Sequence, residues 1–408
     1  MRASIIIPAY NARDRLDLNL KALNEQTWEG SDVEVIVIDN GSTDNTMSVL
    51  KNVRLKYPLK IIRLEENKGI AYARNAGIYE STGDVLIFHD SDMIASKDFI
   101  KLHLELHKEP GIVVCGLFWR RIFTFFYRGF NEYQLMQFEK VMKEKGLYQD
   151  KPYKNASPVI PIEKVTAEDL MQYSFDLDFG FIEDLKAIVR KHGNNLDDYF
   201  LPWRFFITNN VSVDRKNVIE VGMFDNNIVR YGYEDYDLGV RLYKSGCRFV
   251  MADHIVSLHQ EHPGNYQPDD LFININYMCD KYNNIYFIDV PLVCLSDSLN
   301  IDKTNLNNIT REIYKLLPHK EYHDILQLFL NLLQVMRKRT FGCDDNSKAV
   351  LTEIASTLGD YARKTAEMSK KENVPHFVKQ LCNLFKEALD IDFEKMMKNC
   401  EERRQSLE

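Results

Sequence analysis

The sequence is poor in cysteine and contains no paired-cysteine motif. Its 408 residues include seven cysteines, which are scattered, odd in number and never arranged as C-x-x-C. This usage argues against a disulfide framework and against a zinc ribbon, and it is typical of a reduced compartment. We therefore expect a cytoplasmic protein.

Long apolar runs and an excess of positive charge are also missing. No window approaches about 18 uninterrupted apolar residues, and the apolar run at the start of the chain stops at Pro8, so neither a transmembrane segment nor a signal peptide is expected. The net charge of −8 argues against a nucleic-acid partner. G-x-x-x-x-G-K, G-x-G-x-x-G and H-E-x-x-H are absent, which weakens ATPase, dehydrogenase and zincin interpretations.

What is present at the start of the chain is a regular alternation of strand and helix patterns. Continuously apolar, β-branched runs such as "ASIIIPAY" and "VEVIVIDN" are typical of parallel strands buried on both faces. "LKIIRLEEN" and "DVLIFHDSD" are predicted to be further strands, and the segments between them have helical spacing. The pattern predicts a doubly wound α/β domain, whose ligands bind beyond the carboxyl ends of its strands. Applied to this sequence, the rule places the candidate ligand-binding residues at 9–11, 39–44 and 89–92.

The rest of the chain changes character twice. Residues 116–205 are rich in aromatics. We interpret them as an insertion that covers one side of the ligand-binding crevice at the carboxyl ends of the strands. Beyond about residue 266, three long segments with helical periodicity follow one another. We expect a nucleotide-binding domain over 1–265 and an all-helical C-terminal domain over 266–408, which offers a surface for a homo-oligomer.

The D-x-D pattern Asp90-Ser91-Asp92 follows directly on a buried strand. Carboxylate oxygens suit Mg²⁺ or Mn²⁺, which in turn neutralise a diphosphate. The alternative is a solvated turn or a helix cap, because all three residues are common in turns. The apolar strand before them makes the two interpretations about equal on sequence alone.

Two residues upstream fit the same crevice. Asp39 ends a strand and could form a hydrogen bond with a base or ribose in the crevice. The alternative is that this segment only caps the helix that follows, although Asp39 lies too early in the sequence to be the cap itself. Arg74 could reach a phosphate from the helix after Gly69. A single helical arginine more often lies on a solvated face.

Two further groups lie downstream. Glu234, Asp235 and Asp237 cluster at the start of a predicted helix, where the helix dipole favours acids in any case and where one carboxylate could act as a general base. His254, His259 and His262 could complete a metal site begun by carboxylates, or could be surface histidines.

Taken in order, "SIIIPAYN", "VIVIDNGSTDNT", "NKGIAYARNAGI", "LIFHDSDM", "TNNVSV", "VGMFD" and "YGYEDYDLGVRLYKSG" resemble the family 2 glycosyltransferases of GT-A fold. The resemblance covers about residues 3–262 and is nearest to the branch with bacterial chondroitin polymerase domains. It implies a metal-dependent, inverting transfer from a UDP-sugar to a glycan, lipid-linked or peptide acceptor, with Mn²⁺ or Mg²⁺ as cofactor. The implied donor-binding residues are Pro8, Ala9, Tyr10, Asp39, Arg74, Asp90, Ser91, Asn209 and Asn210.

The same resemblance assigns the reacting groups. Asp235 would be the general base, Glu234 would orient the site, and Asp92 and His259 would hold the metal, with His262 as the substitute for His259. A non-catalytic nucleotide-sugar-binding scaffold is one alternative. A nucleotidyltransferase is the other, although "IPAYNARDRL" lacks the glycine-rich loop such enzymes use.

Overall fold

A mixed sheet of nine strands forms the centre of residues 1–271 in the computed structural model, with the order β3-β2-β1-β4-β10-β6-β11-β5 and with β9 paired to β6. β1 pairs in parallel with β2 and β4, and β10 runs antiparallel between β4 and β6. The strands are β1 (Ala3–Ala9), β2 (Val33–Asn40), β3 (Leu59–Leu64), β4 (Val85–Phe88), β5 (Met93–Ala95), β6 (Ile112–Ile122), β9 (Phe175–Asp176), β10 (Val211–Asp214) and β11 (Arg248–Gln260). The predicted α/β fold is confirmed.

Burial on both faces explains why the central strand β1 is almost entirely apolar. In β1, Ile5 and Ile7 belong to the core on the face that also holds Leu16 of helix α1 (Arg13–Asn24). Ile6 points to the opposite face, where a Cβ on Gly77 of helix α3 (Ile70–Glu80) would lie 2.8 Å from its side chain. A strand at the centre of the sheet therefore needs apolar residues on both sides, because successive side chains point to opposite sides. The edge strand β3 has no such need and exposes Lys60 and Arg63.

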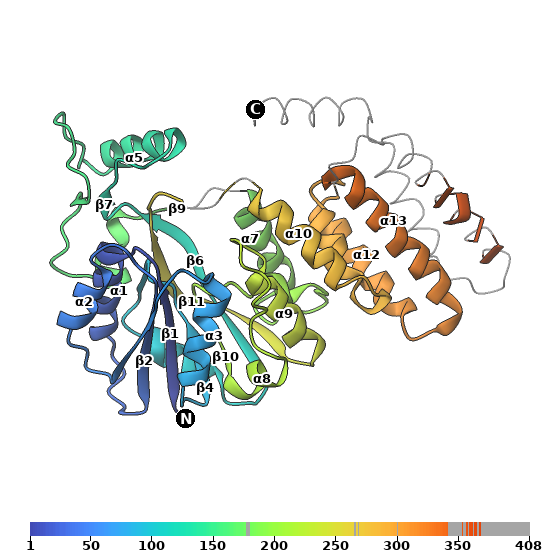
Figure 1. Ribbon diagram of the computed structural model, residues 1–408, viewed down its shortest axis with the longest axis horizontal. Helices are drawn as coiled ribbons and strands as arrows, with labels where there is room; N and C mark the ends of the chain where they lie inside the picture. The colour runs from blue at the N-terminus through green and yellow to red at the C-terminus, as the bar shows by residue number, and fades with distance from the viewer. Residues whose placement is uncertain are drawn as a thin grey trace. The chain divides into compact units, whose positions relative to one another are not determined.

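Helices cover both faces of this sheet, and Figure 1 shows α3 in front of it. The helices of the first unit are α1 (Arg13–Asn24), α2 (Thr46–Asn52), α3 (Ile70–Glu80), α4 (Phe99–Leu106), α5 (Glu132–Glu144), α6 (Ala167–Leu170), α7 (Gly180–His192), α8 (Arg215–Glu220) and α9 (Glu234–Lys244). Short 3₁₀ turns occupy Met171–Tyr173 and Pro202–Phe205. This layering leaves the carboxyl ends of β1, β2 and β4 side by side at one edge.

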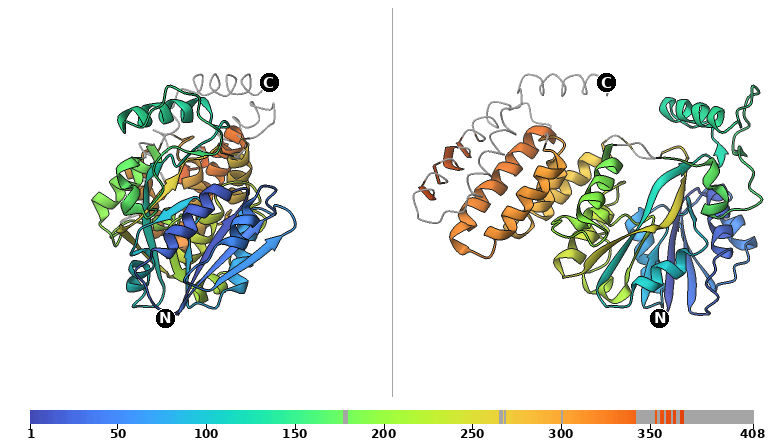
Figure 2. Two further views of the ribbon diagram at one scale, coloured as in Figure 1. Left: turned by 90° about the vertical axis from the view of Figure 1, so that its left-hand side faces the viewer. Right: turned by 180° about the vertical axis from the view of Figure 1, so that it is seen from behind.

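The aromatic-rich segment builds a small core of its own beyond those strand ends. Phe123 stacks on Phe175 with ring centroids 5.3 Å apart and meets Phe138 of α5 edge to face at 5.3 Å. A two-stranded ribbon, β7 (Phe125–Phe126) with β8 (Ser157–Pro158), accompanies α5. Figures 1 and 2 both show α5 at the end of the sheet where the parallel strands finish.

The second unit, Phe272–Glu408, is helical where the structure describes it. Its helices are α10 (Asp270–Lys281, which begins just before the boundary), α11 (Asp289–Leu295), α12 (Lys303–Leu316) and α13 (His323–Phe341), with 3₁₀ turns at Ile285–Phe287 and Lys320–Tyr322.

The structure describes residues 1–176, 180–264, 267, 269–299 and 301–341, with scattered positions between 353 and 368. The helical segments predicted after residue 346 lie largely outside these residues. Within the described residues, no helix has the length and apolarity needed to cross a membrane.

Candidate functional site

The loops after β1 and β2 are tied together at the carboxyl edge of the sheet. Parallel register sets Ala9 beside Asp39. Asn11, which has a positive φ of 48°, accepts hydrogen bonds at its side-chain oxygen from the backbone N–H of Thr43 (2.9 Å) and Asp44 (3.2 Å). Pro8 and Ala9 are buried within β1, and Tyr10 is the first partly exposed residue after them. These hydrogen bonds therefore join the loop after β1 to the loop after β2, beside the carboxyl ends of both strands.

Asp39 lies at the end of β2 with a fully buried side chain. Its Oδ1 accepts a hydrogen bond from the backbone N–H of Ser42 at 3.0 Å. Its Oδ2 lies 3.8 Å from the Nε of Arg63, and it has no hydrogen-bond partner among the residues that the structure describes. One buried acceptor atom at the strand edge is thus left without a hydrogen bond in the described residues.

Arg74 is the centre of a buried ionic bridge. Its Nη2 donates to Asp90 Oδ1 and its Nη1 donates to Glu234 Oε1, both at 2.9 Å. The Arg74 side chain is 2% exposed, and its guanidinium also lies 5.5 Å from the ring centroid of Phe224. Burial lowers the pKa of Arg74, but the charges of Asp90 and Glu234 raise it above its ordinary value.

This geometry corrects the expectation that Arg74 faces a diphosphate. Each Nη atom donates to one carboxylate and the side chain is almost completely buried, so the arginine acts by joining the two acidic motifs. Removing one partner of such a buried pair typically costs roughly 3–5 kcal/mol. Sequence reasoning missed the contact with Glu234 because the two residues are 160 positions apart.

The turn that carries Asp90, Ser91 and Asp92 is fixed from α1. The Asn19 side chain donates one hydrogen bond to the backbone oxygen of Asp90 and one to that of Met93, each at 2.9 Å. Ser91 is buried in this turn. Asn19 was not identified from the sequence, where it reads as one more polar residue of an amphipathic helix.

Glu234 and Asp235 open α9 directly after two residues of positive φ, Gly232 (94°) and Tyr233 (71°). Asp235 Oδ1 accepts a hydrogen bond from the backbone N–H of Tyr236 at 2.8 Å. Burial, together with the adjacent charge of Glu234, raises the pKa of Asp235 to about 8. A carboxylate of that basicity is suited to general-base catalysis near neutral pH.

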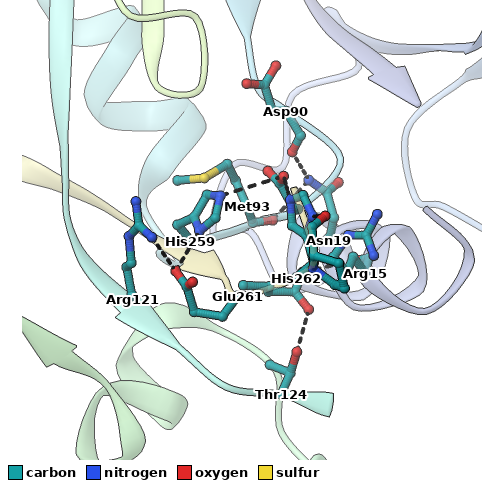
Figure 3. A network of polar contacts seen from close by, with 12 residues as sticks. Arg15, Asn19, Asp90, Met93, Arg121, Thr124, His259, Glu261 and His262 are labelled. Atoms are coloured by element: carbon teal, nitrogen blue, oxygen red, sulfur yellow. Dashed lines mark hydrogen bonds and ion pairs between the residues drawn. The ribbon is translucent and has the colours of Figure 1, made fainter. Parts of the chain in front are cut away.

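Asp92, His259 and His262 converge from two segments of the chain, as Figure 3 shows for the two histidines. β11 pairs with β5 so that His259 lies opposite Met93, one residue after Asp92. The Oδ2 of Asp92 is 2.9 Å from His262 Nε2 and 3.7 Å from His259 Nε2. One ligand atom from each residue lies within 4.8 Å of the others.

Hydrogen bonds hold both histidine rings by the nitrogen that points away from Asp92. Nδ1 of His259 is 3.3 Å from Glu261 Oε1, and Nδ1 of His262 is 2.8 Å from the backbone oxygen of Pro263. Glu261 is in turn paired with Arg121 at 2.8 Å. Figure 3 shows Arg121 and Glu261 beside His259. Sequence reasoning did not identify this supporting pair.

The charges of the cluster keep Asp92 ionised. Burial would raise the pKa of Asp92, but His259, His262 and Arg15 lower it well below its ordinary range. For His259, burial lowers the pKa, and the charge of Asp92 with the hydrogen bond to Glu261 raises it above its ordinary value. One ionised oxygen and two imidazole nitrogens facing one point form a donor set that a divalent cation can occupy.

Asn209 and Asn210 have different environments. Asn209 is buried, and its Oδ1 has no hydrogen-bond partner within the described part of the chain. The prediction that Asn210 binds the donor is corrected, because its side-chain amide forms hydrogen bonds inside the sheet. It donates to the backbone oxygen of Ile255 at 3.0 Å, and its Oδ1 is 3.0 Å from His103 Nε2. Asn210 therefore supports β11, which changes register between Ala252 and Val256.

Comparison with known proteins gives consistent matches. Residues 4–160 match the family model described as glycosyl transferase family 2, and residues 191–262 match that of the N-terminal domain of galactosyltransferase. The chain is 44% identical over 395 residues to the uncharacterized glycosyltransferase YfnE of Bacillus subtilis (strain 168), covering 96% of this chain and 98% of that protein.

More distant relatives match a smaller share of their own length. Identity is 26% over 287 residues with validoxylamine A glucosyltransferase of Streptomyces hygroscopicus subsp. limoneus (68% of this chain, 55% of that protein). It is 26% over 272 residues with chondroitin synthase of Pasteurella multocida (strain Pm70), covering 65% of this chain and 25% of that protein. Among solved structures, S. aureus TarS 1–349 in complex with UDP aligns with a TM-score of 0.47 at 15% identity, over 84% of this chain and 90% of that one.

Proposed function

Because the chain belongs to the family 2 glycosyltransferases, we propose that it is an inverting, metal-dependent enzyme that transfers a sugar from a UDP-sugar to a hydroxyl group of a carbohydrate acceptor. The observation that carries this proposal is the bridge made by Arg74. It joins the turn of Asp90 and Asp92 to the start of α9, so that the candidate metal ligands and the basic carboxylate of Asp235 share one crevice.

The choice of UDP rests on the single acceptor left at Asp39. Its Oδ1 is used by the Ser42 N–H, and only Oδ2 remains. Uracil presents one N–H donor on its pairing edge, flanked by two carbonyl oxygens, and the Arg63 guanidinium beside Asp39 is a donor for one of them. Guanine presents two adjacent donors, and the pairing-edge ring nitrogen of cytosine is an acceptor. Both bases fit a single carboxylate oxygen less well.

The three ligand residues fit a divalent cation by the arrangement of their hydrogen bonds. Since Glu261 and the Pro263 carbonyl occupy Nδ1 of the two histidines, Nε2 of each is presented on the side of Asp92. We infer that Asp92, His259 and His262 all act as ligands, rather than one histidine substituting for the other. Two imidazoles with one carboxylate favour Mn²⁺ over Mg²⁺, which prefers oxygen ligands. Such an ion, when bound, would offset the negative charge of the donor diphosphate.

The protein's own groups perform the proton transfer. Asp235 accepts the proton of the acceptor hydroxyl, whose oxygen forms a bond to the anomeric carbon of the donor sugar. The bond from that carbon to the diphosphate oxygen breaks on the opposite face, and its electron pair leaves with UDP. Arg74 and Glu234 keep Asp235 in place at the start of α9, which is the positioning that makes a base effective.

Tyr231 supports a carbohydrate acceptor. It is 61% exposed, and it lies close to the carboxylates of Glu234 and Asp235. An exposed aromatic ring beside the base is a surface on which a sugar ring can pack.

A nucleotide-binding panel tests the proposal as a whole. We expect UDP to bind at least ~10-fold more tightly than CDP, GDP or ADP by titration calorimetry in the presence of Mn²⁺, because uracil fits the single acceptor at Asp39 and the adjacent Arg63 better than the other bases do. Asp39→Asn should reduce this preference, and Asp32→Asn, a change at the start of β2 far from the strand ends, should leave it unchanged. Tighter binding of GDP would contradict the assignment of the donor.

Replacing Glu261 tests the support of the metal site. We expect Glu261→Gln to weaken Mn²⁺ binding by about 10–100-fold, the usual loss when a partner of a ligating histidine is changed. Mn²⁺ affinity can be measured by the loss of the free-ion EPR signal. Glu109→Gln serves as the control because Glu109 is exposed and pairs only with Arg248 in the described residues. Equal affinities of Glu261→Gln and the wild type would exclude the supporting role.

A further inference from the structure

The diphosphate of a UDP-sugar carries two negative charges and gains a third when the anomeric carbon–oxygen bond breaks, which is one more than a divalent cation offsets. Arg74 is already paired with two carboxylates. Its two Nη atoms are held by Asp90 and Glu234. Arg121 is also engaged, because its Nη1 is paired with Glu261. If the proposed function holds, the diphosphate contact must come from another side chain beside Asp92.

Arg15 on α1 is placed for this contact. Its Nη2 donates to the backbone oxygen of Asn11 at 3.1 Å, which brings the guanidinium to the loop after β1. The guanidinium carbon lies 5.8 Å from the ring centroid of Tyr127. Its Nε is buried and has no hydrogen-bond partner among the described residues. The Nε atoms of Arg74 and Arg121 also lack a partner there, but both of those arginines form ion pairs with carboxylates. Within the described part of the chain no carboxylate forms an ion pair with Arg15, so its charge is left for an anion.

Gln260 fixes Arg15 relative to the metal ligands. The Gln260 side chain donates to the backbone oxygen of Arg15 at 3.0 Å, and the Gln260 backbone N–H donates to the backbone oxygen of Asp92 at 2.9 Å. The other side-chain atom, Oε1, accepts from the hydroxyl of Thr124 at 3.0 Å. Figure 3 shows Arg15 on the side of His262 away from Glu261.

Arg15 thus holds a guanidinium beside the loop after β1, on a helix that Gln260 ties to the backbone of Asp92. A guanidinium can meet two phosphate oxygens with parallel hydrogen bonds, which an ammonium cannot do.

We propose that Arg15, rather than Arg74, is the residue that binds the donor diphosphate and neutralises it as it leaves. When the anomeric carbon–oxygen bond breaks, the electron pair stays on the diphosphate oxygen. The acceptor oxygen takes the place of that oxygen on carbon, and the acceptor proton passes to Asp235. Arg15 donates hydrogen bonds to the diphosphate throughout and keeps its own proton.

The test compares ligands with and without phosphate on three variants. Uridine and UDP are titrated calorimetrically with Mn²⁺ into the wild type, Arg15→Met, Arg15→Lys and Arg13→Met. Arg13 is two positions earlier on α1, has a side chain that is 54% exposed and pairs with Asp14. We expect Arg15→Met to bind UDP about 10–100-fold more weakly, as for loss of a charge-assisted hydrogen bond, and to bind uridine as the wild type does. Arg15→Lys should recover part of the UDP affinity, and Arg13→Met should stay within about twofold of the wild type.

Three outcomes would overturn the inference. If Arg15→Met binds UDP as tightly as the wild type, Arg15 does not contact the diphosphate. If the affinity of Arg15→Met for uridine falls as much as its affinity for UDP, Arg15 only supports the fold of the loop after β1. If Arg13→Met loses as much affinity for UDP as Arg15→Met does, the effect comes from the overall charge of this region and not from a contact of Arg15 with the diphosphate. Absence of UDP binding to the wild type is distinguishable from all three, because it contradicts the proposed function itself.

Discussion

Asp235→Asn is expected to bind UDP as tightly as the wild type and to transfer sugar about 10²–10⁴-fold more slowly, the usual loss when a positioned base is removed. The amide keeps the size of the side chain and its contact with the Tyr236 N–H, so the start of α9 should be preserved. Transfer is measured with a UDP-sugar and an acceptor identified by screening, and binding by calorimetry.

The pH dependence gives this prediction a second readout. The pKa of Asp235 is raised to about 8, so the fraction of the base form grows as the pH rises toward 8. The kcat/KM of the wild type should therefore increase with pH over this range and level off above it. Asp235→Asn should lose this rise. Asp253→Asn, at an exposed position of β11, is the control and should keep it. A wild-type rate in Asp235→Asn would remove the base assignment.

Asp92→Asn is expected to abolish the dependence of UDP binding on Mn²⁺. The amide lacks the negative charge that faces His259 and His262, and a neutral oxygen is a poorer ligand for a divalent cation. Mn²⁺ affinity should fall by more than the roughly 100-fold that changes in supporting residues produce. EPR of free Mn²⁺ and calorimetry with UDP measure the two effects.

A matched variant separates this effect from a general loss of acidic charge. Asp98→Asn lies six residues later in the chain, where the Asp98 carboxylate accepts from the hydroxyl of Thr27. It should keep the affinity of the wild type for Mn²⁺ and UDP. If Asp92→Asn still binds UDP in a Mn²⁺-dependent manner, the ligand set is wrong.

The strands and the acidic motifs could be predicted because their signals are local. β1, β2 and β4 are runs whose burial on two faces shows directly in the residue types, and the carboxyl ends of parallel strands must meet at one edge. Asp39 and Asp92 follow from that rule together with the family resemblance.

The contacts that give the motifs their geometry could not be predicted in this way. The bond from Arg74 to Glu234 spans 160 positions, and the bond from Gln260 to Arg15 spans 245. No periodicity links such residues, because their meeting depends on how the whole sheet is assembled. Asn210 was misassigned for the same reason. The side-chain oxygen of its neighbour Asn209 has no hydrogen-bond partner among the residues that the structure describes, whereas the Asn210 amide contacts His103 and Ile255 inside the sheet.

The position of β10 has a consequence for how the protein is made. β10 lies between β4 and β6 in the sheet but follows them by some 90 residues or more in the chain, as the bounds Val85–Phe88, Ile112–Ile122 and Val211–Asp214 show. At a synthesis rate of about 5–20 residues per second, β4 and β6 are made several seconds or more before β10, the strand that pairs with both. Until then, each has an edge with unpaired backbone groups, the kind of edge that invites association with other chains. The sheet, and with it the crevice, is completed only when the second half of this unit has left the ribosome.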